Sequence, residues 1–285
     1  MPFLPEAVAS VEAQTYRNFE LVVQDCSSTD GSLEFLQSVT RLPRIEIDSE
    51  SDGGLGDAYN RAIARCGGDI IGTIDADNML EPDALEHVVA FMDQHPECAA
   101  VYGGSHMVSP EGRFLHSWMP AEFAPLPLLE CALVPPFAVS FFSRSVCGNR
   151  LRFDERLKTC ADFGLWLQIS HLPIRRIERY LGSTRVSEES MTRRPETYDQ
   201  HLADKTGAVV RYVAAQGDSP LLDAVRDRAL AGIWLWGAES VFALEGKTER
   251  FDTYLERAVN LGPDEARLAR LRAKVACEGV LASET

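Results

Sequence analysis

The chain has 285 residues, of which 45% are hydrophobic and 25% charged, and its formal net charge is −15 because 43 acidic residues outnumber 28 lysines and arginines. This composition is typical of a soluble globular protein and leaves room for one large domain with a smaller appendage. The negative charge makes nucleic acid a poor partner, since a phosphate backbone would be repelled over most of the surface. An anionic ligand stays compatible with this charge if a divalent cation bridges it to acidic side chains.

The seven cysteines occur without a C-x-x-C pair, which predicts reduced thiols and neither a disulfide framework nor a zinc site. No signal peptide is recognisable. The longest apolar window, 125–142, contains a glutamate and four prolines, which argues against a membrane-spanning helix. We therefore expect a cytoplasmic protein, and leave open peripheral contact with the inner face of the membrane.

The hydrophobic pattern from Ala7 to Gly104 alternates between the helical and the extended period. Apolar strands are expected at 19–25, 44–47, 69–75 and 98–104, and helices at 7–16, 31–39, 55–66 and from Pro82 onward. Helices that alternate with nearly continuous apolar strands predict an α/β fold, with a mostly parallel sheet covered by helices on both faces.

The rest of the chain divides into a mixed stretch and a helical tail. Before residue 195 we expect an extended segment at 136–142, a helix after Ala161 and a strand at 174–179. Helices are then expected at 198–216, 221–244, 249–260 and 264–278. This predicts two domains, 1–194 and 195–285. Trp234 and Trp236 mark a candidate surface for self-association through the tail, although burial in its core is the simpler interpretation.

Two aspartates one residue apart, Asp75 and Asp77, follow an apolar strand. In an extended segment their side chains would project to the same side, and hard oxygen ligands suit Mg2+ or Mn2+ when a diphosphate supplies the remaining ligands. Such triplets are common, and Asp77 would also serve as a helix cap or turn residue. Asp25 and the loop that begins at Asp52 also follow strands, so all four aspartates are expected at one crevice outside the carboxyl ends of the strands.

Three stretches of the chain resemble glycosyltransferase family 2, the inverting nucleotide-sugar transferases of the GT-A fold. They are "QDCSSTDGS", "SDGGLGDAYNRAIARCGGDIIGTIDADN" and "FDERLKTCADFGLWLQIS". Each is weak alone, but their order and spacing over residues 5–192 are specific. The resemblance implies a GT-A-like domain that acts with Mn2+ or Mg2+ on a nucleoside diphosphate sugar, expected to be a UDP-sugar. It also implies a hydroxyl acceptor on a glycan or lipid carrier in bacterial surface polysaccharide or glycolipid synthesis.

The resemblance also implies roles for single residues. Asp25 would accept a hydrogen bond from uracil, and Asp52 would belong to the nucleotide-sugar site. Asp75 would contact the ribose or a metal-bound water, and Asp77 would bind the metal. Asp162 would be the catalytic base, since inversion by direct displacement needs one carboxylate to take the proton of the acceptor hydroxyl. As alternatives, Asp25 would form an Asx turn and Asp162 would cap a helix, a role that is compatible with catalysis. Trp166, on the same helix, is assigned to core packing.

The chain departs from the family pattern at two places. Ser187 stands where many members have a histidine, so no ligand is inferred there. Candidates to neutralise phosphate instead are Arg185, Arg193 and Arg194, although solvated surface arginines are the commoner explanation. The central first strand of the family has no counterpart in this sequence, and its loss would leave unpaired backbone groups on both neighbouring strands. Either the assigned start omits that strand, or another segment or chain fills its position.

Two other interpretations stay open. A non-catalytic relative would keep the sheet as a scaffold and bind a partner through the helical tail; the missing strand and the absent histidine favour it, and the retained aspartates oppose it. A nucleotidyltransferase with a similar sheet would need a glycine-rich opening loop that contains a lysine, and the sequence has none.

Overall fold

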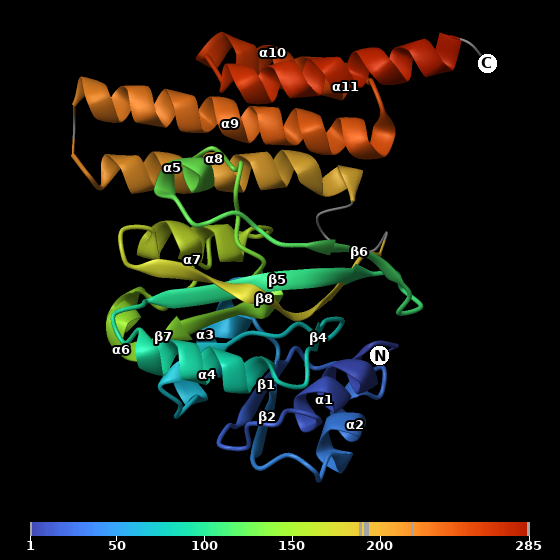
Figure 1. Cartoon of the computed structure of the whole chain (residues 1–285), viewed down its shortest axis with the longest axis vertical. Helices are drawn as coiled ribbons and strands as arrows, with labels where there is room; N and C mark the ends of the chain where they lie inside the picture. The colour runs from blue at the N-terminus through green and yellow to red at the C-terminus, as the bar shows by residue number, and fades with distance from the viewer. Residues whose placement is uncertain (1, 188–189, 191–193, 218, 284–285) are drawn as a thin grey trace. The chain divides into compact units, whose positions relative to one another are not determined.

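The computed structural model describes residues 2–187, 190, 194–217 and 219–283, and the side chains up to residue 276. Strands and helices alternate in the first part of the chain, and the last part is helical (Figure 1). Contacts divide the chain into two compact units, residues 1–123 with 135–188 and residues 124–134 with 189–285. The second unit thus includes a short segment from the middle of the chain. The domain boundary expected after residue 194 stays a prediction.

The first unit contains the strands and the helices that cover them. In chain order they are α1 (Leu4–Glu12), β1 (Leu21–Asp25), α2 (Ser32–Ser38), β2 (Ile45–Ser49), α3 (Leu55–Arg65), β3 (Ile70–Gly72), β4 (Met79–Leu80), α4 (Ala84–Gln94), β5 (Ala100–Val108), β6 (Phe114–Trp118), β7 (Ser140–Ser143), α6 (Arg144–Cys147), α7 (Ala161–Ile169) and β8 (Ile174–Arg185). The expected order of helices and strands up to residue 104 and the α/β class are confirmed. The helix expected to begin at Pro82 begins two residues later, at Ala84.

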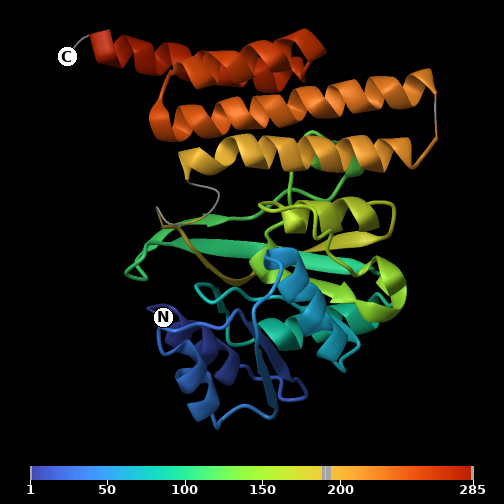
Figure 2. The same ribbon diagram turned by 180° about the vertical axis from the view of Figure 1, so that it is seen from behind.

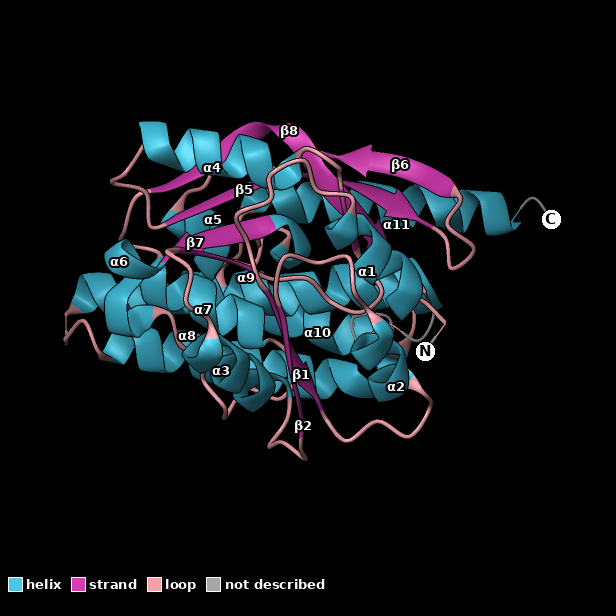
Figure 3. Ribbon diagram, turned by 90° about the horizontal axis from the view of Figure 1, so that it is seen from below, coloured by secondary structure: helices cyan, strands magenta, loops and turns pink. Residues whose placement is uncertain are grey.

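The strands of the first unit form two sheets. β1 pairs in parallel with β2 alone, and the larger sheet has the order β3-β7-β5-β8-β4, with β6 on β5. Figure 3 shows β1 and β2 apart from the strands of the larger sheet. In that sheet only β5 and β8 are parallel; the other four pairings are antiparallel. The expected mostly parallel sheet is therefore corrected to a mixed one. The sequence missed this because a buried strand shows the same apolar run in either direction.

Both faces of the larger sheet are buried, as expected. On one face, Val101 and Leu181 pack in a cluster with Val88 and other residues of α4. The residue after Val101 points to the opposite face, as strand geometry requires. There Tyr102 packs edge-on against Trp166 of α7, with ring centroids 6.2 Å apart. Trp166 is fully buried, which confirms its role in core packing.

The second unit is built from helices. They are α5 (Pro125–Leu129), α8 (Tyr198–Ala214), α9 (Pro220–Glu245), α10 (Glu249–Leu261) and α11 (Glu265–Ser283), and Figure 2 shows the four long helices stacked in order. The expected tail helices are confirmed. The apolar middle of α9 is buried, as expected, whereas Trp234 and Trp236 are half-buried and lie against Arg257 and Lys205. Self-association through these residues stays a prediction. Among the described helices, none has the length and apolar content needed to cross a membrane.

Candidate active site

The D-x-D triplet lies in a turn between β3 and β4. The amide of Asn78 donates to the carbonyl oxygen of Asp75 at 3.1 Å, which closes the turn. The triplet is therefore not extended, and strand alternation does not set the directions of its carboxylates. β4 is held against β8 next to Gly182, where an added Cβ would overlap the carbonyl oxygen of Met79. The missing side chain at this glycine allows the strand after the turn to approach β8 closely.

The carboxylate of Asp75 is held by two side chains. It accepts hydrogen bonds from the hydroxyl of Tyr59 and, at 3.1 Å, from the side-chain amide of Asn78. Burial raises the pKa of Asp75 above its ordinary value, and the charge of Asp162 raises it further, while the two hydrogen bonds act in the opposite direction. Asp75 is thus fixed in position and carries a charge that its surroundings do not fully compensate.

Asp77 and Asp162 belong to the same acidic cluster. Burial and the neighbouring charge of Asp75 raise the pKa of Asp77. Burial also raises the pKa of Tyr59, and the charges of Asp75, Asp162 and Asp77 add to this increase. Asp162 lies in the first turn of α7, far along the chain from the D-x-D turn. The fold therefore brings Asp75 within electrostatic reach of both Asp77 and Asp162. The charges of all three act on Tyr59.

Asp25 and Asp52 make their described hydrogen bonds elsewhere. Asp25 is buried at the end of β1, where it accepts from the amide of Ser28 at 3.0 Å and from the hydroxyl of Ser49 at 2.5 Å. Burial raises its pKa, but these hydrogen bonds outweigh burial and hold the pKa of Asp25 below its ordinary value. Asp52 accepts from the amide of Gly54 at 2.9 Å, just before α3. The common crevice expected for Asp25, Asp52, Asp75 and Asp77 stays a prediction.

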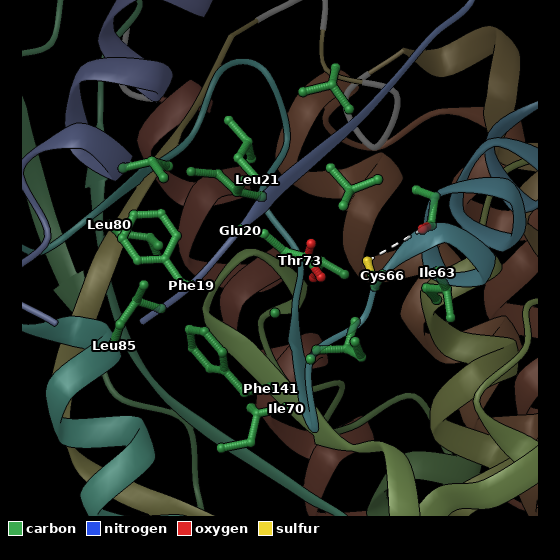
Figure 4. A pocket seen from close by; sticks show the side chains of 18 of the residues that line it. Phe19, Glu20, Leu21, Ile63, Cys66, Ile70, Thr73, Leu80, Leu85 and Phe141 are labelled. Atoms are coloured by element: carbon green, nitrogen blue, oxygen red, sulfur yellow. Dashed lines mark hydrogen bonds between the residues drawn. The ribbon is translucent and has the colours of Figure 1, made fainter. Parts of the chain in front are cut away.

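A cavity of about 1000 Å³ separates the two sheets. It is bordered by Leu21–Gln24 of β1 and Ile70–Gly72 of β3, and it reaches Asp75. Figure 4 shows apolar side chains around it, among them those of Leu85 and Phe141. In the described part of the chain β1 pairs only with β2, and β3 only with β7. This confirms the gap that the resemblance implied between these two strands.

The acidic cluster suits a divalent cation in the chemistry of its donors. Asp75 and Asp77 offer hard carboxylate oxygens, and burial together with a neighbouring carboxylate raises the pKa of each, an effect that a bound cation would oppose. Within the described residues no group of three or more histidine, cysteine, aspartate or glutamate side chains has the arrangement of a complete metal site. The two aspartates therefore fit a cation such as Mg2+ or Mn2+ whose other ligands come from a bound diphosphate or water.

The sequence did not reveal how α3 joins the parts of this site. Tyr59 falls within the helix expected at 55–66, at helical spacing from the apolar residues Leu55 and Ile63. Its hydroxyl nevertheless donates to Asp75, while its ring stacks on Phe153 with ring centroids 4.8 Å apart. The next residue, Asn60, exchanges two hydrogen bonds with the backbone of Phe153, at 2.8 and 3.0 Å. α3 thus links the D-x-D turn to the segment that leads to Asp162. The only sequence signal was a phenol in an otherwise apolar stripe.

The arginines that were candidates to neutralise phosphate lie in different surroundings. The guanidinium of Arg185 is enclosed by protein, with the side chain 1% exposed, so it does not face a ligand. Arg194 is exposed. Arg193 lies outside the described residues. The expected role in phosphate neutralisation is therefore wrong for Arg185, because its donors are used within the fold.

Relatives with a similar sequence include proteins named chondroitin synthase and hyaluronan synthase. The chondroitin synthase of Escherichia coli is 27% identical over 179 residues, which cover 62% of this chain and 26% of that protein. The hyaluronan synthase of Pasteurella multocida is 27% identical over 174 residues, which cover 60% of this chain and 18% of that protein. The matched region is thus only a fraction of the length of these relatives.

Solved structures show the same fold as this chain. TarS 1–349 of S. aureus in complex with UDP-GlcNAc has a TM-score of 0.63 at 19% identity, covering 92% of this chain and 78% of that one. The mannosyltransferase PcManGT from Pyrobaculum calidifontis, in complex with GDP-Man and Mn2+, has a TM-score of 0.56 at 16% identity, covering 91% and 81%. These likenesses establish a GT-A-type fold. The family model "Glycosyl transferase family 2" matches residues 1–157, more than half of the sequence, and the chain therefore belongs to this family.

Proposed function

We propose that the protein is a metal-dependent, inverting glycosyltransferase that moves a sugar from a nucleoside diphosphate, expected to be UDP, to a hydroxyl group. One observation carries this proposal: Asp75 lies within electrostatic reach of both Asp77 and Asp162, although about 85 residues of sequence separate Asp162 from the D-x-D turn. A base and a cation site on the same cluster are what a direct displacement needs. Family membership and relatives with bound nucleotide sugars support the same conclusion.

The donor side of the proposed site is formed by the D-x-D turn. Asp77 would bind the cation, and Asp75, fixed by Tyr59 and Asn78, would contact the ribose or a water on the cation. A divalent cation would stabilise the charge of the departing diphosphate. Asp25 and Asp52 would bind the nucleotide from the end of β1 and the loop before α3.

The acceptor side is assigned to Asp162. Its carboxylate would take the proton of the acceptor hydroxyl as the oxygen attacks the anomeric carbon. Asp162 lies in the first turn of α7, where the partial positive charge of a helix amino terminus suits a carboxylate. An ionised carboxylate is the form that accepts a proton.

The acceptor is proposed to be a glycan or lipid-linked glycan of the bacterial surface. The names chondroitin synthase and hyaluronan synthase support a polysaccharide product. Peripheral contact with the inner face of the membrane, where lipid-linked acceptors are found, belongs to the same proposal.

The cavity supports a second candidate, a non-catalytic scaffold. It separates β1, which carries Asp25, from β3, which leads to the D-x-D turn. If the two halves do not form one donor site, the sheet would serve as a scaffold and the helical unit would bind a partner. The retained acidic cluster favours the enzyme.

Thermal shift measurements with UDP-, GDP- and dTDP-sugars, each with and without Mn2+, separate the two candidates. The enzyme is expected to show stabilisation that needs both ligands, because a ligand that binds only the folded state raises the melting temperature. The scaffold predicts no shift with any of these pairs.

Three variants assign the roles. Asp77→Ala is expected to abolish the Mn2+-dependent shift, and Asp162→Asn to retain the shift while losing turnover by roughly 100-fold or more. Asp252→Ala, at an exposed position on α10, serves as the matched control and should change neither. Metal-assisted binding that survives Asp77→Ala would rule out the site assignment.

A further inference from the structure

Arg185, the last residue of β8, connects three segments through one buried guanidinium. Its Nε donates to the carbonyl oxygen of Asp77 at 3.2 Å. Nη1 donates to the carbonyl oxygens of Ser109 and Pro110 at 3.2 and 2.6 Å, and Nη2 to Oε2 of Glu6 at 2.6 Å. The D-x-D turn, the turn between β5 and β6, and α1 are thus held by the same side chain.

The main chain of Arg185 holds the D-x-D turn from a second side. Its amide donates to Oδ1 of Asn78 at 3.1 Å, and Nδ2 of Asn78 donates to Oδ2 of Asp75 at 3.1 Å. Asn78 is buried, with 5% of its surface exposed. The backbone of Asp77 and the carboxylate of Asp75 are therefore both tied to Arg185, one directly and one through Asn78.

The contacts of Arg185 use properties that only arginine has. Enclosing a cation is costly unless it is paired and hydrogen-bonded. Here Glu6 supplies a carboxylate and the two turns supply three carbonyl oxygens. A planar guanidinium presents five donors in fixed directions, whereas a lysine ammonium is a compact charge on a flexible stem. A lysine would keep the charge but could not satisfy these acceptors together.

The enclosed charge also acts on the turn electrostatically. Burial and Asp75 raise the pKa of Asp77, and the positive charge of Arg185 opposes this increase. The guanidinium thus also places a positive charge near the carboxylate that is proposed to bind the metal.

We propose that Arg185 is a positioning residue that fixes the Asp75–Asp77 turn in the conformation that binds the metal and the diphosphate, without itself touching the donor. The inference rests on the proposed function and adds to it a residue of β8, about 108 positions away from Asp77 along the chain. It also explains why an arginine is enclosed where a phosphate contact was expected.

Arg185→Lys tests this inference, with Mn2+ titrated in the presence of UDP and binding followed by thermal shift and calorimetry. Substitution of a residue that orients metal ligands typically lowers metal affinity by about 10–100-fold. The Mn2+ concentration for half-saturation is expected to rise about 10-fold or more in Arg185→Lys. Circular dichroism of the free variant should match that of the unaltered protein. Arg179→Met is the matched control, because Arg179 lies on the same strand with its side chain 50% exposed and paired with Asp83.

Asn78→Ser provides a second variant in case Arg185→Lys does not fold. It removes the amide that bridges Arg185 to Asp75 but leaves the guanidinium contacts in place. The half-saturating Mn2+ concentration should rise here too, while the turnover of the fully metal-loaded enzyme falls less than the affinity. A purely structural role would lower the melting temperature and leave Mn2+ affinity unchanged.

The outcomes separate this inference from the proposed function. If the unaltered protein binds Mn2+ with UDP and Asp77→Ala does not, the proposed function holds. In that case the inference alone is overturned if a folded Arg185→Lys or Asn78→Ser variant has a half-saturating Mn2+ concentration within twofold of that of the unaltered protein. If the unaltered protein shows no Mn2+-dependent binding of any nucleotide sugar, the proposed function and this inference fall together.

Discussion

The two sheets of the first unit are made from similar residues but differ in burial. β5 begins with six consecutive buried residues, and all four residues of β7 are buried. In β1 only Asp25 is buried, and every residue of β2 is half-buried. β5 has paired strands on both sides, whereas β1 has a partner on one side and the cavity on the other. An apolar run thus suffices to form a strand, but its burial depends on neighbours from elsewhere in the chain.

This difference divides the proposed donor site. Asp25 lies on the two-stranded sheet, while Asp77 lies next to the larger sheet and is tied to β8 through Arg185. Local stability follows the number of buried contacts and paired backbone groups. We therefore expect the metal-binding side of the site, at Asp77, to be more rigid than the side at Asp25 that would bind the uracil ring.

The largest expected difference is in amide hydrogen exchange. The inner amides of β5 should exchange only when the whole unit unfolds, and those of β1 through local opening toward the cavity. Protection factors in β1 are expected to be lower by roughly 1000-fold, measured by exchange with mass spectrometry or NMR. Equal protection in the two strands would contradict the comparison and show that the two sheets unfold together.

Matched leucine substitutions should separate the sheets by stability. Leu181→Ala removes a side chain that is 1% exposed in β8 and is expected to cost about 2–5 kcal/mol in the free energy of unfolding. Leu21→Ala, in β1 and bordering the cavity, should cost about 1 kcal/mol or less, because few packed atoms lose contact. Urea denaturation measures both values, and a Leu21→Ala cost as large as that of Leu181→Ala would show that the cavity wall is packed.

The element types of this fold were predictable from sequence, but the pairing of strands was not. Periodicity identified the strand that ends at Asp25 and the helix from Leu55, because both patterns are local. It did not reveal β4, which has two residues, or β6, an edge strand exposed along its whole length. A short or fully exposed strand has no apolar alternation to detect.

The candidate site was predictable only as far as its motifs reach. Asp75 and Asp77 were found as a D-x-D triplet after an apolar strand, and Asp162 through the resemblance. In the structure all three charges act on Tyr59. Tyr59 and Arg185 act on the acidic cluster from positions 16 and 108 residues away from their hydrogen-bond partners. Such contacts depend on the tertiary fold, so a single sequence gives no sign of them.

Filling the cavity with a strand should reduce the difference in burial and stability between the two sheets. A five-residue apolar strand joined ahead of Phe3 through a short turn would pair with β1 and β3 and bury their apolar lining. A net gain of about 2 kcal/mol would raise the melting temperature by roughly 4–8 °C. The matched control is the same extension with a proline at its centre, which cannot complete the ladder. Equal melting temperatures for the two extensions would show that the cavity does not accept a strand.

The smallest effect is expected from Asp25, whose hydrogen bonds with Ser28 and Ser49 stabilise the end of β1. Burial opposes these hydrogen bonds, but together they hold the folded-state pKa of Asp25 below its ordinary value of 3.8. A carboxylate whose pKa is lowered by folding contributes stability that is fully present above its unfolded pKa and is lost as the pH falls through the folded value. Asp25→Asn should therefore cost about 1 kcal/mol at pH 7, and this cost should shrink as the pH is lowered from about 4 toward 3.

Urea denaturation of both proteins between pH 7 and 3 measures this cost. A cost independent of pH would mean that the charge of Asp25 does not stabilise the strand end. Ligand binding would then be the remaining reason for a carboxylate at this position. Asp48→Asn, on β2 with a side chain 35% exposed, is the control. Asp48 forms an ion pair with Arg65, so the stability cost of Asp48→Asn at pH 7 should shrink when salt is added. The cost of Asp25→Asn comes from hydrogen bonds to Ser28 and Ser49 and should not depend on salt.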